Sequence, residues 1–121
     1  MQSMMKIYRK FAFIAMNYRF MRVLVFFDLP VVLVEDRREY AKFRRFLLKN
    51  GFIMLQESVY SKLALNLTVT NAIISNVKKN SPEKGLVQLL AITEKQFSKM
   101  ELVIGENSGE IIDNDSRLVI L

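Results

Sequence analysis

The chain has 121 residues, enough for one domain, and 51% of them are apolar, which is ample for a packed core. It has no cysteine and no histidine, which excludes disulfides, thiolate metal sites and nucleophile–histidine pairs. The net charge of +6 is uneven, since residues 1–62 hold 12 Lys/Arg against 5 Asp/Glu and residues 63–121 hold 6 against 7. A basic half favours a polyanionic partner, either nucleic acid or an acidic membrane surface, with an ordinary solvated surface as the alternative.

The first twenty residues are basic, free of acids and fairly apolar, as in a targeting presequence. However, the apolar run Phe11–Met16 has only six residues and no small-residue cleavage site follows it. The longer run Phe20–Val34 contains charged residues and a proline, so it is not expected to span a membrane. We therefore expect a cytoplasmic protein with no membrane partner. Met16 and Met21 are alternative start residues, so we interpret residues 1–15 as an N-terminal extension and expect residues 16–121 to form a single domain.

The first expected strand is Met21–Phe27, a continuous run of β-branched and aromatic residues that ends at the turn Asp28-Leu29-Pro30. Such a run is typical of a strand that is buried on both faces. The next segment, Glu35–Asn50, is predicted to be a helix because its apolar residues recur at spacings of three and four and acidic residues crowd its first turns. Gly51 follows as the C-terminal stop.

Phe52–Leu65 alternates only in part between apolar and polar residues, and Gln56-Glu57-Ser58 interrupts it. The interruption suggests a hairpin of two strands, but a single long bent strand is also open. Thr68 or Thr70 is the expected N-cap of a second, shorter helix, which Lys78–Pro82 terminates.

Gly85 leads into Leu86–Ile92, which is predicted to be another buried strand. Thr93–Gln96 has the spacing of a capping box, so a short helix is expected to begin there. Asn107–Ser116 is predicted to be a polar, acidic loop, and Arg117–Leu121 a terminal strand.

The predicted order is β-α-β-β-α-β with an appended short helix and C-terminal strand, which is the ferredoxin-like plan within the α/β (α+β) class. The five-residue terminal strand is almost wholly apolar and would be an aggregation site if it stayed unpaired. Pairing with a second copy of the chain is the simplest solution, so we expect a homodimer.

Asp28 is the candidate catalytic and metal-binding residue. It is expected where the first strand emerges into solvent, and in a two-fold dimer its symmetry mate can lie close by. Two carboxylates that share a site favour Mg²⁺, which activates water for phosphodiester cleavage without a histidine. The alternative is that Asp28 satisfies backbone donors in the Asp-Leu-Pro turn.

The first predicted helix carries basic residues at spacings of four, three and four, which place them on one face. We call this set the basic stripe, and two further arginines flank it: the stripe is Arg38, Lys42, Arg45 and Lys49, and the flanking residues are Arg37 and Arg44. A stripe of this kind binds phosphates, which fix position but carry no sequence information. Because the acids of this helix lie mainly at its N-terminal end, nucleic-acid binding is favoured over an ordinary solvated helix face.

Several stretches of the sequence, in this order and spacing, resemble the type II-A branch of the CRISPR-associated Cas-two proteins. They are Tyr18–Arg22 leading into Phe27–Pro30, Lys42–Leu48, Gly51–Met54 with Ser58–Leu63, and Thr93–Phe97. The match runs in register from about Met16 to Leu121, so residues 1–15 fall outside it.

The resemblance implies a ferredoxin-like homodimer that joins the Cas-one integrase during acquisition of new CRISPR spacers. The dimer would bridge two pairs of integrase subunits and help to hold the incoming prespacer, a DNA duplex. The resemblance also implies a metal-dependent endonuclease that acts on single-stranded RNA or duplex DNA, with the motif carboxylate at Asp28. The basic first-helix positions of the family map onto Arg37, Arg38, Lys42, Arg44, Arg45 and Lys49.

Two functions therefore stay open, an adaptor that clamps DNA and a Mg²⁺-dependent nuclease that uses paired Asp28 side chains. One candidate carboxylate per chain and no histidine make a small catalytic set, whereas the charge layout suits gripping a duplex, so the adaptor is favoured. A small-ligand regulatory domain of the same fold is a third option, but no glycine-rich loop supports it and no small-molecule substrate is expected.

Overall fold

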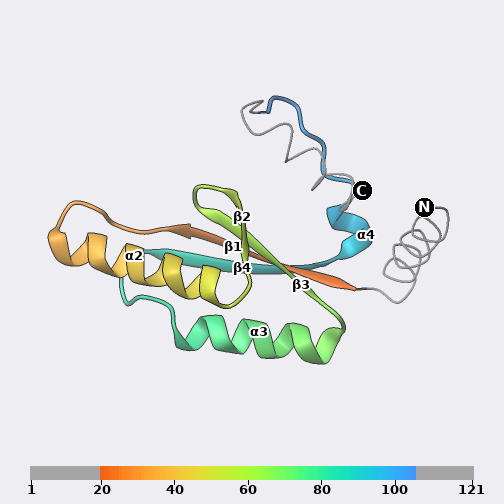
Figure 1. The fold of residues 1–121 in the computed structure, drawn as a ribbon, viewed down its shortest axis with the longest axis horizontal. Coiled ribbons are helices and arrows are strands. Elements are labelled where there is room, and N and C mark those ends of the chain that lie inside the picture. Colours follow the sequence, from red (N-terminus) through yellow and green to blue (C-terminus); the bar gives the residue numbers. More distant parts are fainter. Residues whose placement is uncertain (1–19, 106–121) are drawn as a thin grey trace, which may run out of the picture.

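The computed structural model describes residues 20–105 (Figure 1). The elements follow in this order: β1 Met21–Asp28, α2 Val34–Lys49, β2 Ile53–Gln56, β3 Val59–Ala64, α3 Leu67–Lys79, β4 Leu86–Thr93 and α4 Glu94–Phe97. The four strands form one antiparallel sheet in the order β2-β3-β1-β4. The βαββαβ order with an appended short helix is thus the ferredoxin-like fold expected from the sequence. The expected loop at 107–116 and strand at 117–121, like the extension at 1–15, lie outside the described residues.

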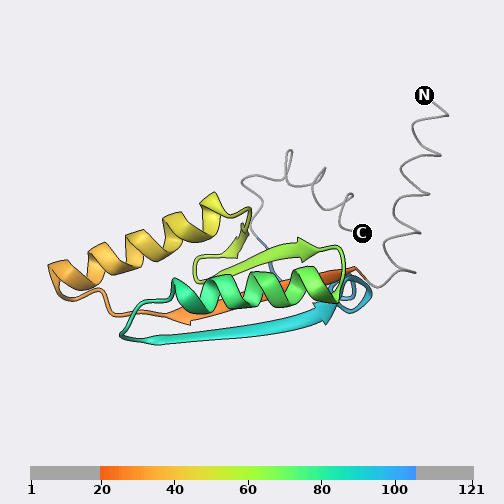
Figure 2. The same cartoon turned by 90° about the horizontal axis from the view of Figure 1, so that it is seen from below.

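The two long helices, α2 and α3, pack on one face of the sheet (Figures 1 and 2). The core lies between them and β1, where Val23, Val25 and Phe27 pack with residues of both helices. The rings of Phe27 and Phe43 of α2 meet edge to face, with centroids 5.3 Å apart. Both views also show the N-terminal part of α2 extending past the end of the sheet.

The opposite face of the sheet, which we call the second face, carries the side chains of β1 that alternate with the core residues. These are Arg22, Leu24, Phe26 and Asp28, together with their register partners on β3 and β4. Leu24 is buried on this face while Val23 and Val25 are buried on the other. The expectation that the first strand is buried on both faces is therefore confirmed, and the cause is its central place between β3 and β4.

The segment Phe52–Leu65 forms a hairpin and not a single bent strand. β2 and β3 pair antiparallel across a turn at Glu57-Ser58, as the polar interruption suggested. The register shifts between Met54 and Gln56, which marks a bulge.

The predicted N-cap of α3 was wrong. Asn66 caps the helix, because its side-chain oxygen accepts a hydrogen bond from the backbone N–H of Val69 at 2.9 Å. Thr68 and Thr70 lie inside the helix, and the Thr70 hydroxyl donates back to the Asn66 carbonyl oxygen at 2.8 Å. Asparagine is among the strongest capping residues, so the helix begins at the first such residue of the segment.

The helix α2 ends as the sequence predicts. Asn50 follows its last residue, and Gly51 has the positive φ of +86° that glycine adopts readily after a helix. Lys62 of β3 donates to the Asn50 carbonyl oxygen at 2.5 Å, which places a positive charge at the negative end of the helix dipole.

The strand β4 was predicted to be buried, and this was wrong. Among the described strands it lies at an edge of the sheet and pairs only with β1, and its residues alternate between exposed and half-buried from Leu86 to Leu90. A run of apolar residues in the sequence does not distinguish a central strand from an edge strand that is covered on only one face. Between residues 20 and 105, no helix is long and apolar enough to cross a membrane.

Candidate functional site

Asp28 is the last residue of β1, and its side chain is exposed. It pairs in register with Leu86 of β4, and the alternation of the strand places it on the second face of the sheet. Among the described residues, its carboxylate makes no hydrogen bond and no ion pair. The alternative that Asp28 satisfies donors in the Asp-Leu-Pro turn is therefore not what the structure shows.

Gly85 lies directly against the end of β1 and was not predicted to belong to the site. Its φ of +96° is one that L side chains rarely adopt, and a Cβ atom there would lie 2.8 Å from the Asp28 carbonyl oxygen and 2.8 Å from a Leu29 methyl carbon. The residue thus lets the start of β4 approach the backbone that carries the Asp28 carboxylate. The sequence shows only a glycine before an apolar run, and the contact depends on the β1–β4 register.

A metal at this position would depend on Asp28 and on groups from outside the described chain. No cluster of three or more potential metal ligands occurs within residues 20–105. A nearby pocket of about 460 Å³ is lined by acidic residues of α2 and by Leu29 and Pro30, but Asp28 does not line it. Because Mg²⁺ keeps several waters and uses one or two carboxylates, Asp28 would supply one of its ligands, and waters or a further carboxylate would supply the others.

The basic stripe runs along the outer side of α2. Arg45 and Lys49 each lie two residues after a buried core residue, Phe43 or Leu47, and on a helix a step of two residues points to nearly the opposite side. Every member of the stripe is exposed. Among residues 20–105 none of them forms an ion pair, since the two ion pairs there join Arg22 to Glu94 and Lys84 to Asp36.

The two flanking arginines differ from the stripe. Arg37 and Arg44 each come one residue after a buried residue of α2, which places them on the side of the helix. Arg37 is also engaged locally, because its Nη1 donates to the carbonyl oxygens of Val31 and Val32 at 3.1 and 2.8 Å. The structure therefore gathers Arg38, Lys42, Arg45 and Lys49 on one outward surface and sets the two flanking arginines beside it.

The stripe and the carboxylate lie on opposite sides of the molecule. The stripe faces away from the sheet on the helix layer, whereas Asp28 belongs to the second face, which the long helices do not cover. Two of the three acidic residues of α2, Glu35 and Asp36, lie in its first turn, where they complement the helix dipole. The third, Glu39, forms no ion pair with the stripe among the described residues. The site residues predicted from the sequence thus form two separate surfaces.

Comparison with known proteins identifies the family. The family model described as CRISPR associated protein Cas2 matches residues 21–100. A protein of Treponema denticola named CRISPR-associated endoribonuclease Cas2 is 55% identical over 84% of this chain and 100% of its own length. Proteins of the same name from Streptococcus mutans and Ligilactobacillus salivarius are 50% and 40% identical over 84% of this chain, covering 93% and 100% of their own lengths. Their extent and identity, on a ferredoxin-like fold with an exposed aspartate at the end of β1, establish that this chain belongs to the Cas2 family of CRISPR-associated proteins.

Proposed function

We propose that this protein is an adaptor of CRISPR adaptation in the prokaryotic cytoplasm. In this role it dimerises, bridges subunits of the Cas-one integrase and holds prespacer DNA for integration, while the integrase performs the chemistry. The observation that carries the proposal is the basic stripe, four exposed cations on one side of α2 without an ion pair among the described residues. Such a surface binds the phosphates of a duplex irrespective of its sequence, as required of a protein that handles any incoming DNA.

The second face supports the homodimer. Four large apolar side chains on it are exposed, by 37% to 61%: Ile53, Leu63, Leu86 and Leu90. Exposed large apolar side chains on one face of a sheet favour an interaction site on that face. If two second faces pack together, α2 of each copy lies on the outside, so the dimer presents two basic stripes to DNA.

A second candidate is a Mg²⁺-dependent endonuclease. The relatives' name, endoribonuclease, favours it, as does the exposed Asp28, whose carboxylate has no hydrogen bond or ion pair within residues 20–105. In a dimer formed through the second faces, the Asp28 side chains of the two copies belong to the same interface, and together they would supply two carboxylates to a Mg²⁺ ion that keeps its remaining waters. Asp28 would hold the metal, and the metal would supply an activated water for attack on a phosphodiester.

Replacement of Asp28 separates the two functions. Asp28→Ala is compared with Glu57→Ala, which removes another exposed carboxylate, in the β2–β3 turn. For an adaptor, Asp28→Ala still dimerises, binds the integrase and supports spacer acquisition, because phosphate contacts come from Lys and Arg. Any Mg²⁺-dependent cleavage of RNA or DNA by the purified protein should disappear in Asp28→Ala and persist in Glu57→Ala. If acquisition collapses in an Asp28→Ala protein that remains a folded, integrase-binding dimer, the carboxylate is part of the mechanism and the adaptor proposal is wrong.

A further inference from the structure

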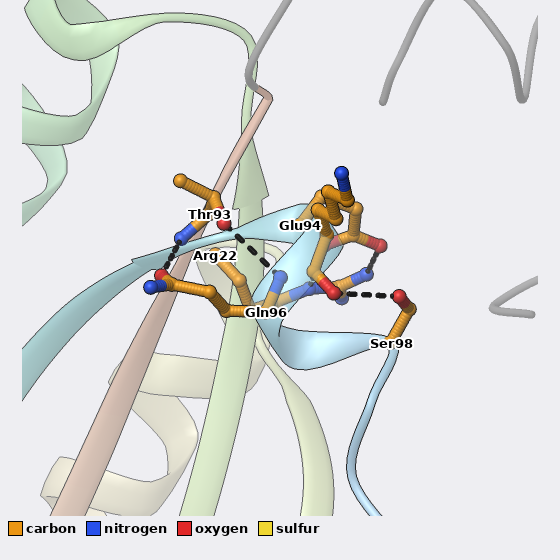
Figure 3. Close-up of polar contacts among 6 residues, drawn as sticks. Arg22, Thr93, Glu94, Gln96 and Ser98 are labelled. Atoms are coloured by element: carbon orange, nitrogen blue, oxygen red, sulfur yellow. Dashed lines mark hydrogen bonds and ion pairs between the residues drawn. The ribbon is translucent and has the colours of Figure 1, made fainter. Parts of the chain in front are cut away.

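A buried ion pair lies at the end of the second face where β1 begins (Figure 3). Arg22 of β1 donates from Nε to Glu94 Oε1 at 2.9 Å and from Nη2 to Glu94 Oε2 at 2.5 Å. The two side chains are only 8% and 11% exposed. The Arg22 guanidinium also lies over the ring of Phe97, with its central carbon 4.4 Å from the ring centroid. One arginine thus contacts both the first and the last residue of α4.

The rest of α4 is fixed to the same place. Thr93 and Gln96 form a complete capping box, with bonds of 3.0 and 2.9 Å, which confirms the prediction from the sequence. The Glu94 N–H donates to the Phe20 carbonyl oxygen at 2.6 Å. Because a four-residue helix is not stable by itself, these contacts with the start of β1 hold α4 in its position.

Stability alone is a poor explanation for this ion pair. Removing two charges from water costs as much as, or more than, their attraction returns, and well-packed apolar residues in their place are often equally stable. A bidentate arginine–carboxylate pair does, however, fix the relative orientation of the two groups. What the pair adds is therefore the direction of α4 relative to β1.

The direction of α4 determines where the next segment starts. The N–H groups of Lys99 and Met100 donate to carbonyl oxygens of Gln96 and Phe97, so the chain leaves α4 in a set direction. Apolar side chains then follow with exposures of 60% to 90%: Met100, Leu102, Val103 and Ile104. A segment with so much exposed apolar surface needs a partner that covers it.

We propose that Arg22 and Glu94 are positioning residues for self-association, which orient α4 so that the apolar segment at Met100–Ile104 packs on a second copy of this chain. The inference rests on the proposed homodimer and deepens it. A second copy is the fitting partner because it offers apolar side chains on an uncovered edge strand, Leu86 and Leu90 of β4. Since β4 leads directly into α4, both halves of the contact are built at the same edge of the fold.

The test exchanges the ion pair for an apolar pair. The double variant Arg22→Leu/Glu94→Leu keeps the site filled with side chains but removes the bidentate hydrogen bonds. The control is Lys84→Ala, which removes the ion pair between Lys84 and Asp36 at 3.8 Å. Circular dichroism monitors folding, and sedimentation equilibrium gives the dimer dissociation constant. We expect the double variant to remain folded while its dissociation constant rises by about tenfold or more, and the control to match the wild type.

A purely stabilising role predicts a different pattern. If the double variant is folded and dimerises with the wild-type constant, the positioning role is wrong although the dimer stands. If the wild type is itself monomeric, the proposed dimer and the positioning role fail together. If the double variant does not fold, Glu94→Gln takes its place, because glutamine keeps the size of the side chain and one of its two acceptor oxygens. A raised dimer dissociation constant in folded Glu94→Gln supports the proposal, and an unchanged dissociation constant overturns it.

Discussion

The close approach of Gly85 to the end of β1 makes a quantitative prediction. In Gly85→Ala the new Cβ would lie 2.8 Å from the Asp28 carbonyl oxygen, which is backbone and cannot rotate away. The positive φ costs a non-glycine residue about 1–2 kcal/mol, and forcing an extra methyl group into packed surroundings adds about 1–3 kcal/mol. We therefore expect Gly85→Ala to lower the free energy of unfolding by about 2–5 kcal/mol.

Gly51→Ala is the matched control. Gly51 has a similar positive φ, +86°, but its added Cβ would approach nothing closer than the flexible Lys62 side chain, at 3.5 Å. Only the conformational cost applies there, so we expect a loss of about 1–2 kcal/mol. The difference between the variants isolates the clash with the Asp28 backbone, since the gain from a less flexible unfolded chain is common to both.

Urea denaturation at one fixed protein concentration measures both losses and avoids the concentration dependence that self-association introduces. Because Gly85→Ala displaces the backbone of Asp28, it should also reduce any cleavage that depends on this carboxylate, whereas Gly51→Ala should not. Equal losses of stability in the two variants would show that Gly85 does not restrict the space at the end of β1, and the reasoning would be refuted.

Two further predictions address the corrected helix cap and the C-terminal strand. Asn66→Ala should lower the free energy of unfolding by about 1 kcal/mol in the same assay, because the backbone N–H of Val69 loses its hydrogen-bond acceptor. Thr68→Ala should change this free energy little, and a larger loss for Thr68→Ala than for Asn66→Ala would contradict the assigned cap. Deletion of residues 117–121, which the sequence predicts to pair with an edge strand of a second copy, should give monomer or aggregate in sedimentation, and a clean, stable dimer would exclude that pairing.

Much of the fold could be predicted because local patterns determine it. The apolar run of β1 indicates a strand buried on both faces, and the polar Gln56-Glu57-Ser58 correctly indicated a hairpin. The cap of α3 was missed because Asn66 and two threonines offer similar capping chemistry within a few residues. The exposure of β4 was missed because it depends on strand order, which an apolar run does not encode.

In the candidate site, too, the sequence predicts the features that depend on a local pattern and misses those that depend on contacts between distant residues. The basic stripe follows from helical periodicity alone, so the sequence places its members correctly on one face of α2. The packing of Gly85 against Asp28 and the Arg22–Glu94 pair join residues far apart in the chain, the latter across 72 positions. Such contacts depend on the β1–β4 pairing and on the placement of α4, and no local pattern predicts them.

The central claim is that the basic stripe of α2 holds duplex DNA, and the salt dependence of binding tests it most directly. Arg38, Lys42 and Arg45 are changed together to Ala, with Lys78, Lys95 and Lys99 changed to Ala as a control that removes the same charge from exposed positions outside α2. Affinity for duplexes of several sequences is measured by fluorescence anisotropy over a range of salt concentrations. We predict that the stripe variant binds all sequences more weakly and that its slope of log affinity against log salt falls by about one unit for each phosphate that the variant no longer binds. Unchanged affinity and slope in the stripe variant, or an equal loss in the control, would contradict the account and place the DNA surface elsewhere.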